Sequence, residues 1–329
     1  MVLISKLVRK ILKSFLSFFV RKSLFDFSSQ KKLIDISNSE LSKEETNKKI
    51  GEMILNEKPF LVGRFGWTEL DVLIRFERYS KMNTIEKIFE WSRLNIYPFS
   101  KKCLLYEIHT KAGFYPVNKY SLEKFREIMI KTMPEIDILG SWLDGESNYI
   151  QFMKNIEFCK LEFLEPYFCK NPWSKNLKNK KVLVIHPFTE TIKKQYELNR
   201  EKIFLNKDVL PEFDLRLMKT TFTNKGAQVK HKDWFEKLES MFIEAISFEF
   251  DIAIIGCGSY GLPLAAKLKS YGKQAIHLGG ATQLLFGIKG KRWAENPSFY
   301  KLFNNFWVYP SIDELPKTAV QIDNACYWK

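Results

Sequence analysis

The sequence has few cysteines, five in 329 residues, and none of them forms a C-x-x-C pair or the spacing of a metal site. They stand at scattered positions: Cys103, Cys159, Cys169, Cys257 and Cys326. An odd, dispersed set of this kind is typical of reduced thiols in a reducing compartment. The sequence therefore predicts a cytoplasmic protein and argues against a disulfide scaffold or a cysteine-based zinc site.

Long uninterrupted apolar runs are also missing. The chain is 45% hydrophobic with a mean hydropathy of −0.24, which suits a large buried core and is too polar for a multi-span membrane protein. A transmembrane helix needs about 20 mostly apolar residues, and basic residues interrupt the N-terminal apolar stretch too often for that. The same stretch has neither the unbroken apolar core nor the cleavage site of a secretory signal.

Acidic residues are absent from the first 22 residues, although six of the 14 net positive charges lie there. The basic residues are Lys6, Arg9, Lys10, Lys13, Arg21 and Lys22. Polar positions recur at helical spacing, and large apolar residues cover the rest of the surface. Residues 1–24 are therefore predicted to form a basic amphipathic helix on an anionic membrane surface. A core helix of the globular domain is the alternative.

The whole chain carries 52 Lys and Arg against 38 Asp and Glu, which suits an anionic partner. Nucleic acid, phospholipid headgroups and a phosphorylated substrate all have this character. The largest basic cluster lies on the apolar N-terminal helix, and no recognisable nucleic-acid-binding motif is present. We therefore expect no nucleic-acid partner.

The most informative stretch is 251–293, which begins with the apolar run 252–255. Gly256, Gly258 and Gly261 follow in a G-x-G-x-x-G pattern, directly before a predicted helix. Such glycines permit a tight turn, and the free N–H groups of the helix face an incoming phosphate. The pattern predicts a phosphate-binding strand–turn–helix unit.

An acid expected of dinucleotide-binding folds is missing from this unit. Those folds place an Asp or Glu about 20 residues after the glycines, where it binds the ribose. Here the next strand, 274–278, ends in Gly279 and Gly280. We therefore expect no NAD and a phosphate-bearing ligand of another kind. The alternative is that the glycines only permit close packing of strand and helix.

Apolar strands alternate with helices along the chain. Strands are expected at 59–63, 137–142, 181–186, 214–221, 252–255 and 274–278, and helices at 42–56, 71–78, 121–133, 187–204, 234–248 and 262–270. This alternation predicts an α/β, Rossmann-like, doubly wound and mainly parallel sheet over residues 25–329. The basic, polar segment 172–180 is a candidate internal joint.

The region 81–172 is predicted to be mainly helical, apart from the short strand near 137–142. Its Asp144-Gly145-Glu146 sequence is compatible with a metal-binding acid pair, but we interpret it as a polar turn.

Polar residues with a capacity for chemistry follow two of the expected strands. Arg64, Gly66 and Glu69 come after the strand 59–63, where open α/β sheets bind ligands; a structural Arg64–Glu69 ion pair is the alternative. His186 ends another strand, and Glu190 falls in the first turn of the next helix. A carboxylate can orient an imidazole for proton transfer, whereas a structural histidine is the simpler reading.

The loop after the glycine unit combines pliable glycines with cations. Gly279 and Gly280 open it, and Lys289, Lys291 and Arg292 close it. Cations beside a phosphate-binding turn can neutralise a diphosphate. The loop is therefore predicted to bind the phosphates of the same ligand.

In order along the chain, these features resemble the GT-D type glycosyltransferases, bacterial enzymes of Rossmann-like fold that use nucleotide-diphosphate sugars. The resemblance rests on Arg64-Phe65-Gly66-x-x-Glu69, the glycine-rich turn, the Gly279-Gly280 loop, Trp307-x-x-Pro310 and the Tyr327-Trp328 ending. It implies a sugar-nucleotide donor, with a UDP-sugar favoured, held by the segments above together with Gln283. It also implies a saccharide acceptor in bacterial surface polysaccharide or glycoconjugate synthesis. The basic N-terminal helix indicates that this acceptor is a lipid-linked saccharide at the inner face of the cell membrane.

The resemblance fails at one position of the motif. The family continues its RFG segment with Asp-x-Glu at the metal-bound sugar-nucleotide site, and here Trp67 replaces the Asp while Glu69 remains. A divalent metal, Mn²⁺ or Mg²⁺, therefore stays open, with Glu69 as its candidate ligand. For proton transfer we expect Glu69 first, and Glu190 with His186 next. A non-catalytic nucleotide-binding module at the membrane is the alternative function.

Overall fold

The computed structural model describes residues 40–81, 104–224, 226–322 and 325–329. The amphipathic helix expected in residues 1–24 lies outside these ranges, as does Cys103. None of the described helices is long and apolar enough to cross a membrane.

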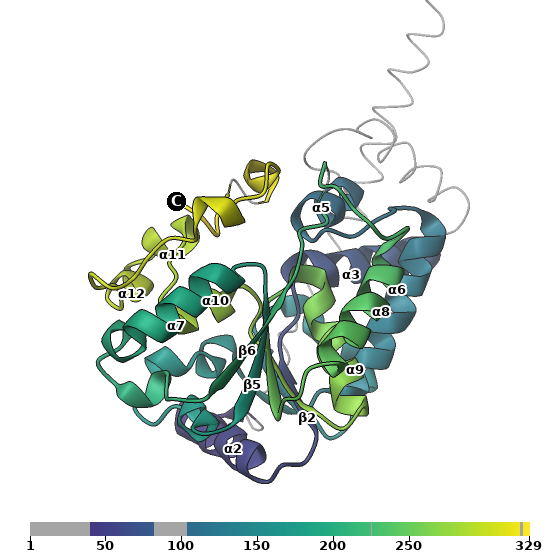
Figure 1. The fold of residues 1–329 in the computed structure, drawn as a ribbon. Helices are drawn as coiled ribbons and strands as arrows, with labels where there is room; N and C mark the ends of the chain where they lie inside the picture. The colour runs from purple at the N-terminus through teal and green to yellow at the C-terminus, as the bar shows by residue number, and fades with distance from the viewer. Residues whose placement is uncertain (1–39, 82–103, 225, 323–324) are drawn as a thin grey trace, which may run out of the picture.

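An eight-stranded sheet with all strands parallel forms the centre of the molecule (Figure 1). Its strand order is β1-β4-β3-β2-β8-β7-β5-β6. The strands are β1 (Glu40–Leu41), β2 (Phe60–Gly63), β3 (Ile138–Ser141), β4 (Glu157–Lys160), β5 (Lys181–His186), β6 (Asp214–Lys219), β7 (Ile252–Ile255) and β8 (Gln274–His277). The predicted α/β, doubly wound architecture is confirmed.

Helices cover both faces of the sheet. They are α2 (Lys43–Leu55), α3 (Trp67–Lys81), α5 (Leu104–Lys111), α6 (Lys119–Thr132), α7 (Thr189–Ile203), α8 (Trp234–Ile246), α9 (Gly261–Ser270), α10 (Thr282–Leu285), α11 (Lys291–Ala294) and α12 (Pro297–Tyr300). In Figure 1, α3, α6, α8 and α9 lie on one side of the strands, and α2, α7 and α10 on the other.

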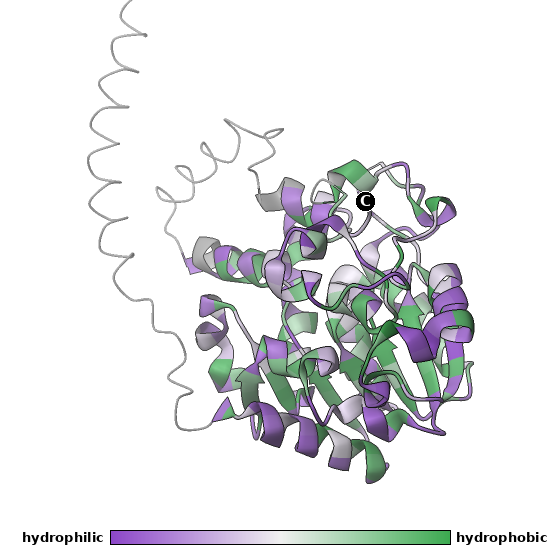
Figure 2. Cartoon of the chain, turned by 90° about the vertical axis from the view of Figure 1, so that its left-hand side faces the viewer, coloured by the Kyte–Doolittle hydropathy of each residue, from purple (hydrophilic) through white to green (hydrophobic). Residues whose placement is uncertain are grey.

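The central strands are buried on both faces, which explains why they are continuously apolar in sequence. In β5, Leu183 and Ile185 belong to the core under α8 and α9, whereas Val182 and Val184 belong to the core under α2 and α7. Side chains alternate between faces along a strand, so each strand contributes to both cores. Figure 2 shows the resulting hydrophobic sheet between more polar helices.

Side-chain caps begin the helices that the sequence predicts most clearly. Ser42 and Glu45 form a capping box at the start of α2, Asn118 caps α6 and Asp233 caps α8. These caps satisfy backbone N–H groups that have no partner inside the helix. They confirm the expected helix start at Ser42 and set the first residues of the other two helices.

Two strands are missing from the sequence prediction, β1 and β4. They pair with each other at one edge of the sheet, and β4 lies in the region expected to be helical. The candidate joint 172–180 lies between β4 and β5, two strands of the same sheet. Its Trp173 and Leu177 are fully buried against the α2 face.

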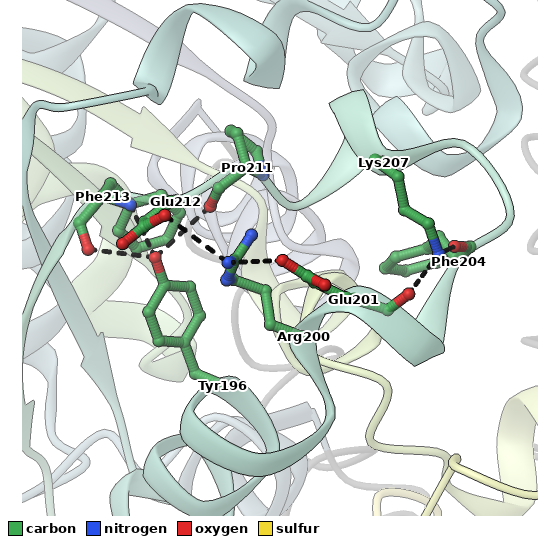
Figure 3. A network of polar contacts seen from close by, with 8 residues as sticks. All are labelled: Tyr196, Arg200, Glu201, Phe204, Lys207, Pro211, Glu212 and Phe213. Carbon is green, nitrogen blue, oxygen red and sulfur yellow. Dashed lines mark hydrogen bonds and ion pairs between the residues drawn. The ribbon is translucent and has the colours of Figure 1, made fainter.

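A polar network ties the end of α7 to the start of β6 (Figure 3). The Tyr196 hydroxyl accepts the Phe213 N–H at 2.6 Å, and Arg200 lies 3.7 Å from the Glu212 carboxylate. Lys207 donates to carbonyls in the last turn of α7. Because β6 begins here, the network lies at the amino edge of the sheet and is structural.

Candidate functional site

The carboxyl ends of the parallel strands meet at one edge of the sheet, as the topology requires. From β5 the chain moves outward to β6, whereas from β7 it moves in the opposite direction to β8. Open α/β sheets bind ligands outside the strand ends at such a reversal. This reversal lies between β5 and β7, and the loops after β2, β3 and β8 lie along the same carboxyl edge of the sheet.

Arg64, directly after β2, is partly buried and held in one orientation. Its Nε and Nη2 atoms both donate to the Phe65 carbonyl at 3.1 Å. The guanidinium carbon lies 4.4 Å from the centroid of the Trp142 ring, in a cation–π contact. A Cβ on Gly279 would lie 3.6 Å from Nη1 of Arg64, so the glycine-rich loop after β8 passes close beside it.

Charged and polar groups from four separate segments act electrostatically on this guanidinium. Burial is the main cause that lowers the pKa of Arg64; Tyr327, Glu69 and Glu165 raise it, and Arg292 lowers it. Such influence between side chains acts over short distances. Arg64 is therefore the point at which the start of α3, the segment after β4, α11 and the C-terminal segment converge.

The end of β3 places Trp142 against Arg64. The Trp142 indole N–H donates to the Phe65 carbonyl at 3.0 Å, and the ring remains 43% exposed. Behind it, the fully buried Glu146 carboxylate accepts the Ser141 hydroxyl and the Trp142 backbone N–H. Burial raises the pKa of Glu146 to about 7. The interpretation of Asp144-Gly145-Glu146 as a polar turn is wrong for Glu146, which braces the end of β3.

Glu165 is a second buried carboxylate beside Arg64, 8% exposed, in the turns that follow β4. Burial raises its pKa to about 7, while the neighbouring Tyr167 hydroxyl and Arg64 act in the opposite direction. Tyr167 itself is buried, and burial raises the pKa of its phenol well above the usual value. Glu165 is therefore a carboxyl group whose protonated form is favoured by burial.

Glu69 lies in the first turn of α3, and its carboxylate folds back over Gly66. A Cβ on Gly66 would meet the Glu69 Oε2 atom at 2.0 Å, so only glycine leaves room for this arrangement. Glu69 also attracts Arg64 electrostatically. The structure thus brings together Arg64, Gly66 and Glu69, as the sequence motif indicated.

Two glycines of the turn after β7 serve close packing. A Cβ on Gly256 would lie 2.7 Å from the His186 ring, the Gly279 carbonyl and the Thr282 hydroxyl. A Cβ on Gly261 would lie 2.2 Å from the His277 ring. The packing alternative therefore accounts for both positions and leaves the third glycine to be explained.

Gly258 is different, because its backbone has a φ of +60°. The nearest atom to a Cβ built there is the Ala112 carbonyl oxygen at 3.8 Å, so the residue faces open space. The side chains beside it anchor the turn: the Ser259 hydroxyl donates to Ala112 at 2.6 Å, and the Tyr260 hydroxyl lies 2.9 Å from that of Thr223. A rigid turn with its open side at Gly258, before the ten-residue helix α9, fits an approaching phosphate.

Both histidines at the strand ends are buried and neutral. Burial lowers the pKa of His186 and of His277 to about 3, and the charge of Arg64 contributes for His277. The His186 Nδ1 accepts the Phe188 N–H at 3.0 Å, and the His277 Nδ1 lies 3.2 Å from the Ile255 carbonyl oxygen. These contacts are those of structural histidines.

Glu190 begins α7 with an exposed side chain. Its N–H donates to the buried Glu314 carboxylate at 2.8 Å, and so does the N–H of Thr191. The N-terminus of α7 is thereby occupied by a carboxylate from the C-terminal segment. No hydrogen bond between Glu190 and His186 occurs in the part of the chain that the structure describes, and the geometry offers no support for the proposed pair.

The loop after β8 and the chain terminus are packed together. A Cβ on Gly280 would lie 2.6 Å from the Tyr327 ring. The Gln283 amide donates to the carbonyls of Ile288 and Tyr327, and its own Oε1 is buried without a hydrogen-bond partner in the described residues. Gln283 therefore holds the terminal segment in place, and Tyr327 lies over the glycine loop.

The three cations of this loop do not act as one group. The Lys289 ammonium lies 4.9 Å from the centroid of the Tyr309 ring, and Lys291 and Arg292 are both exposed. Arg292 lies 5.0 Å from the Tyr327 ring centroid and influences Arg64. Arg292 is therefore the cation of the three that the structure places at the Arg64 cluster.

A cavity of about 650 Å³ adjoins this cluster at the ends of β3 and β4. It is lined by Lys43, Ser141, Trp142, Lys160, Leu161, Glu162, Glu165, Phe168, Asn296, Ser298 and Phe299. Trp142 and Glu165 thus belong to both the cavity and the surroundings of Arg64. Volumes of about 300–1,000 Å³ are usual for small-molecule sites.

Sequence reasoning did not identify Trp142, Glu146 or Glu165. Trp142 ends an expected strand, so the same strand-end argument that selected Arg64 and His186 would have found it. Glu165 lies among short 3₁₀ turns that have no periodic pattern. Its position becomes apparent only in three dimensions.

The residues do not fit a resident divalent metal. No three His, Cys, Asp or Glu side chains converge on one point among the described residues. The sequence candidate, Glu69, is near Arg64, whose positive charge would oppose a bound cation. We therefore derive no chemistry through a metal.

A comparison of the chain with models of known protein families, with curated proteins and with solved structures finds no similar family, protein or structure.

Proposed function

We propose that this protein is a glycosyltransferase that moves a sugar from a nucleotide-diphosphate sugar, with a UDP-sugar favoured, to a saccharide acceptor. The observation that carries the proposal is the cluster around Arg64 at the carboxyl edge of the sheet. There a fixed guanidinium meets an exposed tryptophan face, a glycine-rich loop, and a cavity with a buried carboxyl group. Such groups can stabilise a leaving diphosphate, pack against a sugar ring and accept a proton, which supports the proposal.

The diphosphate is the first requirement, because it leaves with negative charge. Arg64 and Arg292 supply cations, and the open side of the turn at Gly258 lies before the N-terminus of α9. Donors fixed in advance stabilise a developing charge without reorganising during the reaction. This arrangement supports a role in holding and releasing a diphosphate.

Proton removal from the acceptor hydroxyl is the second requirement. We assign it to Glu69, which lies beside Arg64 at the start of α3. The hydroxyl oxygen bonds to the anomeric carbon, the bond from that carbon to the diphosphate breaks, and the diphosphate leaves with the bonding electrons. The hydroxyl proton passes to the carboxylate.

The membrane is the third element of the proposal. The basic, apolar pattern of residues 1–22 suits the anionic cytoplasmic face of a cell membrane. An acceptor attached to a lipid would be presented at the same surface. We therefore place the enzyme peripherally at the inner face, acting on a lipid-linked saccharide.

The test is a thermal-shift and calorimetric panel of UDP-, GDP-, CMP- and dTDP-sugars with wild type, Arg64→Gln and Arg75→Gln. Arg75 is a matched control, because its side chain is exposed on α3 and pairs with Asp71. A charge-assisted hydrogen bond contributes about 1.5–3 kcal/mol, so Arg64→Gln should weaken nucleotide binding about 10- to 100-fold. Arg75→Gln should bind like wild type.

A wild-type protein that binds none of the nucleotides refutes the proposal. Equal binding by Arg64→Gln and Arg75→Gln removes the Arg64 cluster from the donor site. Nucleotide binding without release of the sugar in the presence of cell-envelope acceptor lipids favours the non-catalytic module instead.

A further inference from the structure

The cavity beside Arg64 has a chemical character of its own. Two lysines, Lys43 and Lys160, and two glutamates, Glu162 and Glu165, contribute opposite charges to its lining. Glu162 and Glu165 offset the charge of the two lysines, Glu165 only in part because burial raises its pKa to about 7. Carboxylates that line the cavity repel a diphosphate, so the cavity suits a neutral ligand.

Both aromatic and polar residues line this space. The rings of Trp142, Phe168 and Phe299 line it together with the polar side chains of Ser141, Asn296 and Ser298. Aromatic faces pack against the C–H groups of a sugar ring, and short polar side chains hydrogen-bond to its hydroxyls. The combination is suited to a saccharide.

Glu165 gives the cavity a strong hydrogen-bonding group. Its side chain is 8% exposed, and it lines the cavity while lying close enough to Arg64 to influence that residue's pKa. A buried carboxylate forms strong hydrogen bonds with hydroxyl donors. It therefore lies where a sugar hydroxyl inside the cavity would approach the Arg64 cluster.

Trp142 connects the cavity with the donor region. Its ring lines the cavity and also packs against the Arg64 guanidinium, 4.4 Å from the ring centroid. We propose that this cavity is the acceptor site, and that it binds a neutral saccharide stacked against Trp142 and hydrogen-bonded to Glu165. This inference rests on the proposed function, because it takes the Arg64 cluster as the donor side.

The test uses a cavity-filling substitution and a matched control. Ser298 is an exposed residue of α12 at the cavity wall, so Ser298→Trp should fill the cavity without disturbing the core. Ser270→Trp makes the same change at the exposed end of α9, on the opposite edge of the sheet. Nucleotide binding is measured by calorimetry, and binding of methyl glucoside, methyl galactoside, methyl N-acetylglucosaminide and their disaccharides by saturation-transfer NMR.

With UDP present, we expect glycoside signals for wild type and Ser270→Trp, and their loss in Ser298→Trp. All three proteins should bind UDP equally. At about pH 8, where Glu165 is ionised, the isosteric Glu165→Gln should weaken glycoside binding about 10-fold, since a charge-assisted hydrogen bond becomes a neutral one.

Failures of the two proposals are distinguishable. If the wild-type protein binds no nucleotide, the proposed function is refuted. If it binds nucleotide but gives no signal from any glycoside, only the acceptor assignment is overturned. Undiminished glycoside binding by Ser298→Trp also overturns it. If Ser298→Trp weakens UDP-sugars more than UDP, the cavity holds the donor sugar and the acceptor assignment is wrong.

Discussion

Replacing Gly258 tests whether the turn after β7 receives a phosphate. The residue has a φ of +60°, and a side chain there would meet nothing closer than 3.8 Å. Gly258→Ala introduces only backbone strain, about 1–2 kcal/mol for a residue in the left-handed region. Gly258→Asp introduces no more strain, because Asp tolerates this region better than Ala, and it adds a negative charge on the open side.

The two variants should therefore separate folding from binding. At about 5 Å and an effective dielectric of about 20, one pair of like charges costs about 3 kcal/mol. A factor of ten in affinity corresponds to about 1.4 kcal/mol, so Gly258→Asp should bind a nucleoside diphosphate about 100-fold more weakly than Gly258→Ala. Both should lose a similar amount of unfolding free energy.

Isothermal titration calorimetry at about 50 and 500 mM salt measures the difference in UDP affinity between the two variants. Urea denaturation measures the unfolding free energy that both variants lose through backbone strain. Because salt screens charge repulsion, the gap between the variants should narrow at the higher concentration. Equal UDP affinity in the folded Ala and Asp variants would refute a phosphate at this turn. The glycine would then serve only the shape of the backbone.

Three further predictions concern other parts of the chain. Glu69→Gln should lower turnover about 100- to 10,000-fold, the usual effect of removing a general base, while UDP binding persists; near wild-type transfer would leave Glu69 as a structural partner of Arg64. Burial raises the pKa of Glu146 from 4.5 to about 7, so the folded state binds this proton more tightly than the unfolded state, and between about pH 4.5 and 7 this group reduces stability as pH rises. Glu146→Gln should remove up to about 3 kcal/mol of this pH-dependent loss of stability, measured by urea denaturation of the variant and wild type at pH 5 and 7.5. The buried His186 and His277 have the opposite pH dependence, but they are present in both proteins and drop out of the comparison. If the two proteins differ in unfolding free energy by the same amount at both pH values, the prediction is wrong. Deletion of residues 1–22 should abolish flotation with anionic vesicles, and equal flotation of the truncated protein would disprove the membrane helix.

Much of the fold could be predicted because local and global signals agree. The four residues of β7 and the four central residues of β5, Val182–Ile185, are all apolar, since each strand is buried on both faces. The start of α2 is marked by Ser42 and Glu45, whose capping contacts are local in sequence. Each of these features depends on neighbouring residues, which a sequence displays directly.

The errors lie where that agreement ends. The strand β1 has only two residues, and β4 has a charged residue at each end instead of a continuous apolar run; both lie at the outer edge of the sheet. Their existence depends on pairing with partners far away in the chain. Glu146 looked like part of a polar turn, but the fold buries it completely and supplies Ser141 as its donor.

The candidate site likewise contains some features that the sequence predicted and others that it did not. The motif Arg64-x-Gly66-x-x-Glu69 forms one local arrangement, in which the Glu69 carboxylate occupies the space that a Cβ on Gly66 would take. The glycines at 256 and 261 match the phosphate pattern equally well, yet His186 and His277 occupy the space beside them. Glycines in a sequence motif show where side chains are absent, but the motif does not show which group of the folded protein occupies the space.

The sequence by itself determined the strand-and-helix alternation, the parallel sheet and the local contacts after β2, because these follow from periodicity and from residues close together in the chain. Only the tertiary structure decided that Trp142, Glu165, Arg292 and Tyr327 surround Arg64. These residues come from segments separated by up to about 260 positions, and no local pattern encodes their meeting. They converge because parallel strands bring all their carboxyl ends to one edge, whatever the distance between them along the chain.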